Sequence, residues 1–285
     1  MTLSIVTVSH RSERHLPRYV ESFLASGSGR GGAEIEFVIV ENSGQDHADA
    51  MLDPLRRAGF PVRFIQVENL GFGAGCNAGA ARARGETLVF ANPDLAFIDP
   101  LDPIDALVDE RTWGTVMQED GRGWGYAFDV LPEYKTVSGE LRGRYRSFTP
   151  ADERWKDRLY PVGSFFIAAR SLFQAAGGFD ERFFMYHEEA ELSRRLHRMV
   201  GPPTLFDGVR VLHEAFGSEV SRDATLRREA RGLLTYAAIT GERRILRTRA
   251  LTQMLMSLLS SQARRRLRLL IEEARAARRE EARPA

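Results

Sequence analysis

The stretch from Asn69 to Phe97 reads NLGFGAGCNAGAARARGETLVFANPDLAF. Its glycines at 71, 73 and 75 predict a turn that runs into a helix of small residues over Gly73 to Arg84, because glycine tolerates tight turns and close packing. A β-rich run from Thr87 to Phe90 follows, and Asp94 stands where that strand should end. A glycine-rich turn, a helix start and a carboxylate at a strand end together predict a site for a phosphorylated ligand.

Strand and helix signals alternate through the first half of the chain. Short apolar and β-branched runs predict four buried strands with helices between them. The strands are expected at Leu3 to Val8, Phe37 to Val40, Val62 to Ile65 and Thr87 to Phe90, and the helices over Leu16 to Leu24 with Ser12 as N-cap, Ala48 to Ala58 and Gly73 to Arg84. This alternation predicts an α/β fold with a mainly parallel central sheet flanked by helices.

Polar segments follow each predicted strand. In open sheets of this kind, ligands collect at the carboxyl ends of the strands. One edge of the sheet should therefore carry residues 9–11, 41–43, 69–71 and 92–94. A second interpretation of the glycines stays open, in which they only pack a tight turn against the sheet. The spacing is not that of a P-loop, because no Gly-Lys-Ser/Thr follows.

Composition limits the class of protein. The 285 residues include 40 basic and 39 acidic side chains, a net charge of +1, so no nucleic-acid partner is expected without a recognition motif. The single cysteine, Cys76, excludes an internal disulfide framework. There is no apolar run of about 18 residues and no charged start followed by an apolar run. A cytoplasmic protein is expected.

Three motifs in order extend the pattern through two thirds of the chain. They are Asn69-x-Gly-Phe-Gly-x-Gly-x-Asn77, Asn92-Pro93-Asp94, and GGFDERFFMYHEEAEL from Gly177 to Leu192. Together they resemble the motifs of family 2 inverting glycosyltransferases of the GT-A fold, with the closest likeness to the rhamnosyltransferase-like branch. The resemblance covers residues 3–216. It implies a glycosyltransferase domain over residues 1–216, with a nucleotide-sugar-binding half (1–98) and an acceptor and catalytic half (99–216), followed by a helical C-terminal extension (217–285).

The resemblance implies a divalent metal, Mn²⁺ or Mg²⁺, that bridges the two phosphates of the donor. Asp94 is the predicted ligand, and His213, which ends a predicted strand, is predicted to complete the site. Asn92 replaces the first acid of the more usual Asp-x-Asp pattern and supplies at best a neutral oxygen. Such a metal would neutralise the charge that develops on the leaving diphosphate. On propensity alone, Asn-Pro-Asp is also typical of a turn that closes a strand, and a lone histidine is usually a surface or core residue.

Glu188 and Glu189 stand where the family has its Glu-Asp or Asp-Asp pair, at the start of a predicted helix. By the motif match, Glu189 is the general base that takes the proton from the acceptor hydroxyl, in a single displacement that inverts the sugar. Glutamate is one methylene longer than the commoner aspartate, so the assignment stays open between Glu189 and Glu188. Glu191 is implied as an acceptor-site or orienting group. Carboxylates in a first helical turn are also favoured simply by the helix dipole.

Donor and acceptor contacts are predicted from the same match. Those to the donor are Val8, Ser9, Arg11, Glu41, Asn69, Gly71, Phe72, Asn77, Asn92 and Asp94. Those to the acceptor are Gly163, Ser164 and Glu191, with the aromatic-rich residues 113–165 on the acceptor side. The resemblance implies uridine or thymidine diphosphate as the nucleotide. His10-Arg11 replaces the Tyr-Asn that the family often shows before Ser12, and this departure leaves guanosine open as an alternative.

The expected activity is sugar transfer from a UDP- or dTDP-sugar, with dTDP-rhamnose among the candidates, to a hydroxyl of a saccharide or lipid-linked acceptor in cell-surface polysaccharide synthesis. Two other classes stay open. One is a non-catalytic sugar-nucleotide-binding protein, which the unusual Asn92 and Glu189 favour. The other is a nucleotidyltransferase, which should show a basic, glycine-rich phosphate signature near its start, and this chain shows none there.

The tail carries an apolar helical stripe followed by a basic run. The stripe consists of Leu251, Met254, Leu255, Leu258 and Leu259, and the run RRRLR begins at Arg264. An amphipathic basic helix can lie on an anionic membrane, which would place the enzyme at the inner face of the plasma membrane. Packing on its own domain or formation of a homodimer is the first expectation for this helix, and membrane contact is the alternative.

Overall fold

The four predicted strands form the parallel part of the central sheet. The computed structural model describes residues 2–44, 46–119, 125–141, 154–213, 222–258 and 260–281. The strands are β1 (Thr2–Ser9), β2 (Glu34–Glu41), β3 (Val62–Gln66) and β4 (Thr87–Ala91). β1 pairs in parallel with β2 and β4, and β2 pairs in parallel with β3, so the carboxyl ends of all four meet at one edge.

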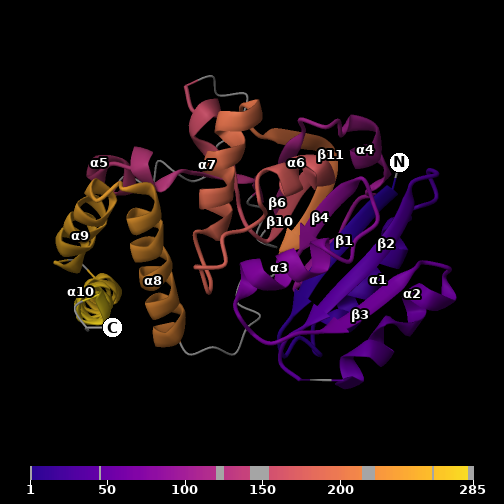
Figure 1. The fold of residues 1–285 in the computed structure, drawn as a ribbon, viewed down its shortest axis with the longest axis horizontal. Coiled ribbons are helices and arrows are strands. Elements are labelled where there is room, and N and C mark those ends of the chain that lie inside the picture. The colour runs from indigo at the N-terminus through magenta and orange to yellow at the C-terminus, as the bar shows by residue number, and fades with distance from the viewer. Residues whose placement is uncertain are drawn as a thin grey trace.

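Later segments extend this sheet with mixed pairing (Figure 1). β10 (Phe165–Ala169) runs antiparallel to β4 and is followed across the sheet by β6 (Trp113–Glu119), β11 (Thr204–His213) and β5 (Leu95–Phe97). β11 is parallel to β6 and antiparallel to β5. β7 (Gly125–Tyr126) pairs with β6, and β8 (Phe128–Val130) pairs with β9 (Leu159–Pro161) in a separate small sheet. The predicted α/β fold is confirmed.

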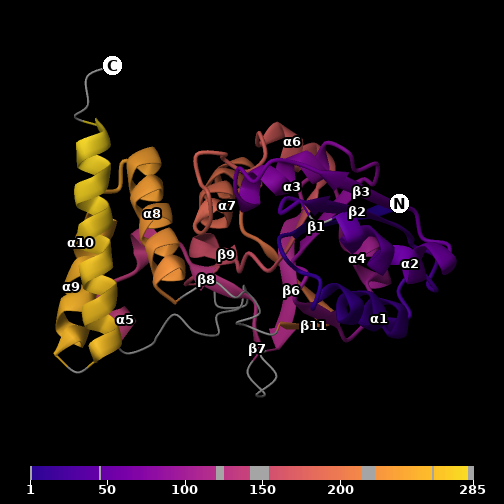
Figure 2. The same ribbon diagram turned by 90° about the horizontal axis from the view of Figure 1, so that it is seen from below.

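Helices cover both faces of the sheet (Figure 2). α3 (Phe72–Ala80) and α6 (Arg170–Ala175) lie on one face, and α1 (Leu16–Ser26), α2 (Asp53–Arg57) and α4 (Asp102–Leu107) lie on the other. Gly75 of α3 faces β1, where a Cβ atom would stand 2.9 Å from Cγ2 of Val8. The packing interpretation of the glycine-rich helix is therefore confirmed at Gly75.

Two local predictions were wrong. Ser12 is not the N-cap of α1: the helix begins at Leu16, and the Ser12 carbonyl accepts the amides of His15 and Leu16 in the turn before it. The helix expected over Ala48 to Ala58 is a 3₁₀ helix, η1 (Asp46–Leu52), followed by the short α2. Pro54 at the first turn of α2 explains the break, because proline favours a helix start and cannot donate to a preceding turn.

The acidic motif opens α7 (Glu188–Val200), and three helices follow it: α8 (Arg222–Thr240), α9 (Arg244–Ser257) and α10 (Ser261–Glu281). α7 stands between these C-terminal helices and the sheet (Figure 1). A second apolar core joins α8 to residues between 131 and 190 and includes Leu131, Tyr160, Phe183, Ala190, Leu233 and Tyr236. The short helices between β8 and β10 are η2 (Pro132–Tyr134), α5 (Val137–Leu141) and η3 (Lys156–Arg158).

The predicted boundary at residues 216 and 217 lies outside the described residues, as does Leu259. The apolar stripe does not follow one helix, because α9 ends at Ser257 and Leu258 lies beyond it. Among the helices that the structure describes, none is long and apolar enough to cross a membrane.

Candidate active site

The loops after β1, β2 and β3 are hydrogen-bonded into one rim. Nδ1 of His10 lies 2.9 Å from Oδ1 of Asn42. The Asn42 side chain donates to Oδ1 of Asn69 at 3.3 Å. Arg11, with a left-handed φ of 52°, donates its backbone N–H to Oγ of Ser43 at 3.0 Å. The predicted gathering of these strand ends is therefore observed.

Several buried oxygen atoms of the predicted site have no hydrogen-bond partner. They are Ser9 Oγ, Glu41 Oε2, Asn92 Oδ1, Asp94 Oδ1 and Glu188 Oε2. Buried polar atoms in native proteins are nearly always paired, because leaving one unpaired costs about 1–3 kcal/mol. Unpartnered buried atoms also occur elsewhere, among them those of Thr87 and Ser193, but the five at the predicted site support a surface that a polar ligand completes.

Glu41 illustrates how the rim leaves one oxygen available. The residue is 1% exposed, and its Oε1 accepts the backbone N–H of Ser43 at 2.6 Å and the Ser43 hydroxyl. Its Oε2 has no partner. The orientation of the carboxylate is thus fixed by Ser43, while one oxygen stays available to a ligand hydroxyl or base.

Asp94 and His213 lie together where β5 begins and β11 ends. Oδ2 of Asp94 is 3.6 Å from Nε2 of His213, and the hydroxyl of Tyr126 lies 2.6 Å from Nδ1 of the same ring. The β11–β5 register explains the proximity, because His213 stands opposite Leu95, the residue after Asp94. Tyr126 is a site residue that the sequence analysis missed; it arrives through the short β7 pairing.

The oxygens of Asn92 and Asp94 and the imidazole of His213 fit part of the ligand shell of a divalent metal. Carboxylate and amide oxygens suit Mg²⁺ and Mn²⁺, and an imidazole nitrogen is compatible with Mn²⁺. The unpaired oxygens of Asn92 and Asp94 agree with a cation at this position. Within the described ranges, however, no group of three or more His, Cys, Asp or Glu side chains is placed to hold a metal ion. Oxygens of a bound diphosphate would have to complete the coordination.

Gly163 and Ser164 connect this edge to the acidic motif. The backbone N–H of Asn92 donates to the Ser164 carbonyl at 2.9 Å. A Cβ atom at Gly163 would stand 3.3 Å from the carboxyl carbon of Glu189. Ser164 itself is buried and donates to the side chain of Gln118, whose nitrogen has no partner. Gln118 is a second site residue that carried no signal in the sequence.

The chain enters α7 through an unusual backbone. Tyr186 and His187 have left-handed φ values of 73° and 71°. Such a conformation costs roughly 1–3 kcal/mol for a residue other than glycine and persists only where the surroundings impose it. It fixes the direction in which Glu188 and Glu189 leave the loop.

The two glutamates differ in environment. Glu188 is 3% exposed and lies against Gly73 of α3, and burial raises the pKa of its carboxyl well above the usual value. Glu189 faces Gly163, and burial raises its pKa to about 7, with further contributions from Asp129, which raises it, and Lys135, which lowers it. A carboxylate that titrates near 7 is matched to proton abstraction at neutral pH.

Asn77 and Glu191 support the 177–182 loop. The Asn77 side chain donates to the Phe179 carbonyl and accepts the Phe179 N–H, each at 2.9 Å. Glu191 accepts from Arg195 at 2.6 and 3.0 Å, and Arg195 donates in turn to the Gly178 carbonyl at 2.8 Å. Asn77 and Glu191, together with the 177–182 loop, line a hollow of about 440 Å³. These are positioning contacts, and a direct donor contact by Asn77 or acceptor contact by Glu191 stays a prediction.

Gly71 and Phe72 touch the segment that precedes the acidic pair. A Cβ atom at Gly71, whose φ is 115°, would stand 2.8 Å from Cα of Phe184. The Phe72 backbone N–H donates to the Phe184 carbonyl at 2.9 Å. The glycine-rich loop is thus in direct contact with the loop that carries Glu188 and Glu189. Residues 120–124 and 142–153 of the predicted acceptor region lie outside the described residues.

The chain matches one family model, and its fold is similar to those of several solved structures. The family model described as Glycosyl transferase family 2 matches residues 4–191. N-acetylglucosaminyl-diphospho-decaprenol L-rhamnosyltransferase of Mycobacterium tuberculosis is 28% identical, over 74% of this chain and 75% of that protein. The mannosyltransferase PcManGT from Pyrobaculum calidifontis, solved with GDP-Man and Mn²⁺, has a TM-score of 0.57 at 13% identity, covering 99% of this chain and 76% of its own. GalNAc-T7 with UDP, GalNAc and Mn²⁺ gives 0.60 at 20% identity, covering 82% of this chain and 48% of its own, so this chain spans about half of that protein.

Proposed function

The chain belongs to glycosyl transferase family 2 and has the GT-A fold, and we propose that it is an inverting, metal-dependent glycosyltransferase with Glu189 as its general base. The observation that carries the proposal is the position of Glu189. Its carboxylate lies against Gly163, which is joined through Ser164 to the Asn92–Asp94 edge, and burial raises its pKa to about 7. The proposed base and the proposed leaving-group site are connected through these two residues.

The proposed donor is a UDP- or dTDP-sugar, with dTDP-rhamnose as the first candidate because the mycobacterial relative is an L-rhamnosyltransferase. Val8, Ser9 and Glu41 would contact the nucleoside, and the unpaired oxygens of Ser9 and Glu41 support this role. Arg11 and the Asn69–Phe72 loop would contact the diphosphate.

The reaction that this geometry supports is a single displacement. Glu189 takes the proton of the acceptor hydroxyl while that oxygen attacks C1 of the sugar, and the bond from C1 to the diphosphate breaks on the opposite face. Asp94, His213 and the Asn92 amide would hold Mn²⁺ or Mg²⁺, which supplies charge neutralisation to the departing diphosphate. Glu188, whose raised pKa favours the protonated form, is less suited to accept a proton.

The proposed acceptor is a saccharide or lipid-linked saccharide of cell-surface polysaccharide synthesis. The printed name of the mycobacterial relative includes a diphospho-decaprenol-linked sugar, which supports the lipid-linked class. Gly163 and Ser164 stand beside the base, as does a polar cluster in which Lys135 donates to Asp129 at 2.6 Å and Tyr160 donates to the same carboxylate at 3.3 Å. This cluster would bound the acceptor side of the cleft.

A lipid-linked acceptor would bring the enzyme to the inner face of the plasma membrane. Leu251, Met254, Leu255 and Leu258 are 47%, 50%, 41% and 78% exposed. The basic run that begins at Arg264 lies in the first turns of the next helix, α10, which begins at Ser261. We propose that this face contacts an anionic membrane, with a homodimer as the alternative.

The experiment that tests the function is thermal stabilisation of the protein by UDP-, dTDP- and GDP-sugars, each with Mn²⁺, Mg²⁺ or a chelator. A ligand that binds the native state raises the melting temperature. One donor that stabilises only with metal would support the proposal and name the nucleotide. Binding without any transfer to acceptors would favour the non-catalytic class, and no stabilisation by any donor would reject the donor site.

A further inference from the structure

The loop Phe184–His187 leads into the acidic pair, and its backbone lies in close contact with two glycines. On one side lies Gly71 of the glycine-rich loop, as described above. On the other side lies Gly232 of α8, where a Cβ atom would overlap the Tyr186 carbonyl oxygen and stand 2.9 Å from the Met185 carbonyl oxygen. Any side chain at position 232 would therefore push against the backbone of this loop.

α8 makes further contacts with the same loop. The Arg228 guanidinium lies 5.5 Å from the centre of the Phe184 ring, a cation–π distance. The rings of Tyr236 and His187 are 6.1 Å apart. Because Tyr186 and His187 hold left-handed conformations, the loop needs surroundings that impose them, and α8 supplies one wall of those surroundings.

α8 is also connected to α7 itself. The Tyr236 hydroxyl donates to Oε2 of Glu133 at 2.7 Å, and Oε1 of the same carboxylate lies 3.2 Å from Nε of Arg194. Glu133 is buried, so this bridge is shielded from solvent. α8 therefore contacts the loop that precedes α7, and it is also linked to α7 itself through Glu133 and Arg194.

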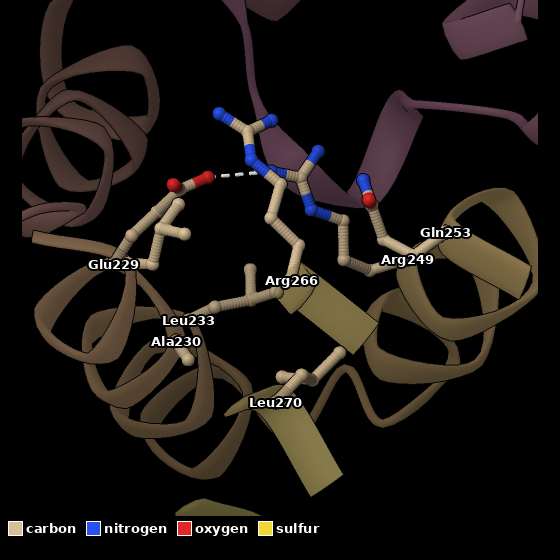
Figure 3. A pocket seen from close by; sticks show the side chains of 8 residues that line it. Glu229, Ala230, Leu233, Arg249, Gln253, Arg266 and Leu270 are labelled. Carbon is tan, nitrogen blue, oxygen red and sulfur yellow. Dashed lines mark hydrogen bonds and ion pairs between the residues drawn. The ribbon is translucent and has the colours of Figure 1, made fainter. Parts of the chain in front are cut away.

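The other C-terminal helices keep α8 in place. Figure 3 shows Glu229 of α8 paired with Arg249 of α9, and the other end of that guanidinium donates to Glu140 at 2.9 Å. Arg227 and Arg231 pair with Glu273 of α10 at 2.9 and 2.6 Å. The cavity between the three helices is only about 20 Å³, room for one water, so α8 has little freedom to retreat from the loop.

We infer that Gly232 is a positioning residue for Glu189, and that α8, supported by α9 and α10, holds the Phe184–His187 loop in its strained conformation. This inference rests on the proposed role of Glu189. Moving the loop would displace the carboxylate from the acceptor hydroxyl and let water reach it. The donor rim lies on the loops after β1, β2 and β3, and its Gly71 and Phe72 touch the Phe184–His187 loop from the side opposite α8.

The test is Gly232→Ala in the full chain, with transfer measured at saturating acceptor. We expect kcat to fall by about 10- to 100-fold, since small misplacements of a catalytic group have effects of that size. The KM for the donor should change less than kcat does, because the displaced loop reaches the donor side through Gly71 and Phe72 while it carries Glu189 itself. The acid limb of the kcat profile should move to lower pH, because a more hydrated carboxyl has a lower pKa.

Ala230→Gly is the matched control. Its side chain lines the cavity between α8, α9 and α10 instead of the loop (Figure 3). The substitution weakens the same helix without adding bulk against the loop, so it should lower the melting temperature while changing kcat and the pH profile less than Gly232→Ala does. The comparison thereby distinguishes the effect of destabilising α8 from the effect of displacing Glu189.

Arg228→Gln keeps the inference testable if Gly232→Ala does not fold, because it removes the contact with Phe184 without adding bulk. It should lower kcat by about two- to tenfold at unchanged donor KM. A folded Gly232→Ala protein with the kcat and pH profile of the parent would overturn the inference, as would an unfolded Gly232→Ala beside a fully active Arg228→Gln. Absence of transfer by the parent protein with every donor would reject the proposed function instead.

Discussion

Gly163 lies directly against Glu189, and a methyl group at position 163 would stand 3.3 Å from the Glu189 carboxyl carbon. That distance is tight enough to shift the carboxylate by a few tenths of an ångström. We expect Gly163→Ala to lower kcat by about tenfold and to leave donor affinity unchanged, because the contact is with the base. Steady-state kinetics with donor titration by calorimetry would check this, and a loss of donor affinity at full kcat would contradict it.

Glu189→Gln should abolish transfer while donor binding survives. General-base catalysis contributes about 10²- to 10⁴-fold, so kcat should fall by that amount, and the isosteric amide keeps the packing against Gly163. Product formation from a labelled donor is the measurement. Glu188→Gln is the matched control, and equal losses for both variants would leave the base unassigned between them.

The rate should depend on pH through Glu189. Burial raises its pKa to about 7, and a general base works only when deprotonated, so kcat should fall about tenfold for each pH unit below 7 and level off above it. A profile at saturating substrates from about pH 5 to about pH 9 tests this. An inflection near the ordinary glutamate value of about 4.3 would mean that another group limits the rate.

Asp94→Ala should remove metal-dependent donor binding, and His213→Ala should weaken it by at least about 10- to 100-fold, which is the loss seen when only a group that orients a ligand is removed. Tyr126→Phe removes the hydrogen bond to the imidazole and should have a smaller effect in the same direction. Donor affinity with and without Mn²⁺ is the readout. Equal affinity of Asp94→Ala and the parent under both conditions would rule out the metal role.

The exposed face of α9 should bind anionic vesicles. Replacing Leu251, Met254 and Leu255 together by serine removes apolar side chains that are already solvent-exposed, so the fold should survive while co-sedimentation with vesicles that contain phosphatidylglycerol is lost. Neutral vesicles serve as the comparison. If the parent does not sediment but is dimeric by light scattering, and the triple variant is monomeric, this face is the dimer interface.

The rim was predictable because it depends on local patterns. Ser9, Glu41 and Asp94 each end a β-branched run, and parallel strands place their carboxyl ends at one edge. The position of Tyr126 beside His213, and that of Gly232 beside Tyr186, depend on contacts between distant segments that leave no periodic signal. At Ser12 a local pattern gave the wrong prediction. Serine is a frequent N-cap, but a turn before α1 delays the start of that helix to Leu16.

The place of β11 in the sheet has a consequence for the order of folding. It is the last strand of the described chain, yet it lies between β6 and β5, and the register that it imposes sets His213 opposite Leu95. β5 therefore has no partner on that side until the chain has been made as far as residue 213, and contacts of such long range form slowly. The two proposed metal ligands meet only when this insertion is complete. A cation held by Asp94 and His213 would then stabilise finished molecules and not partly folded ones, so the proposed cofactor would also favour completion of the fold.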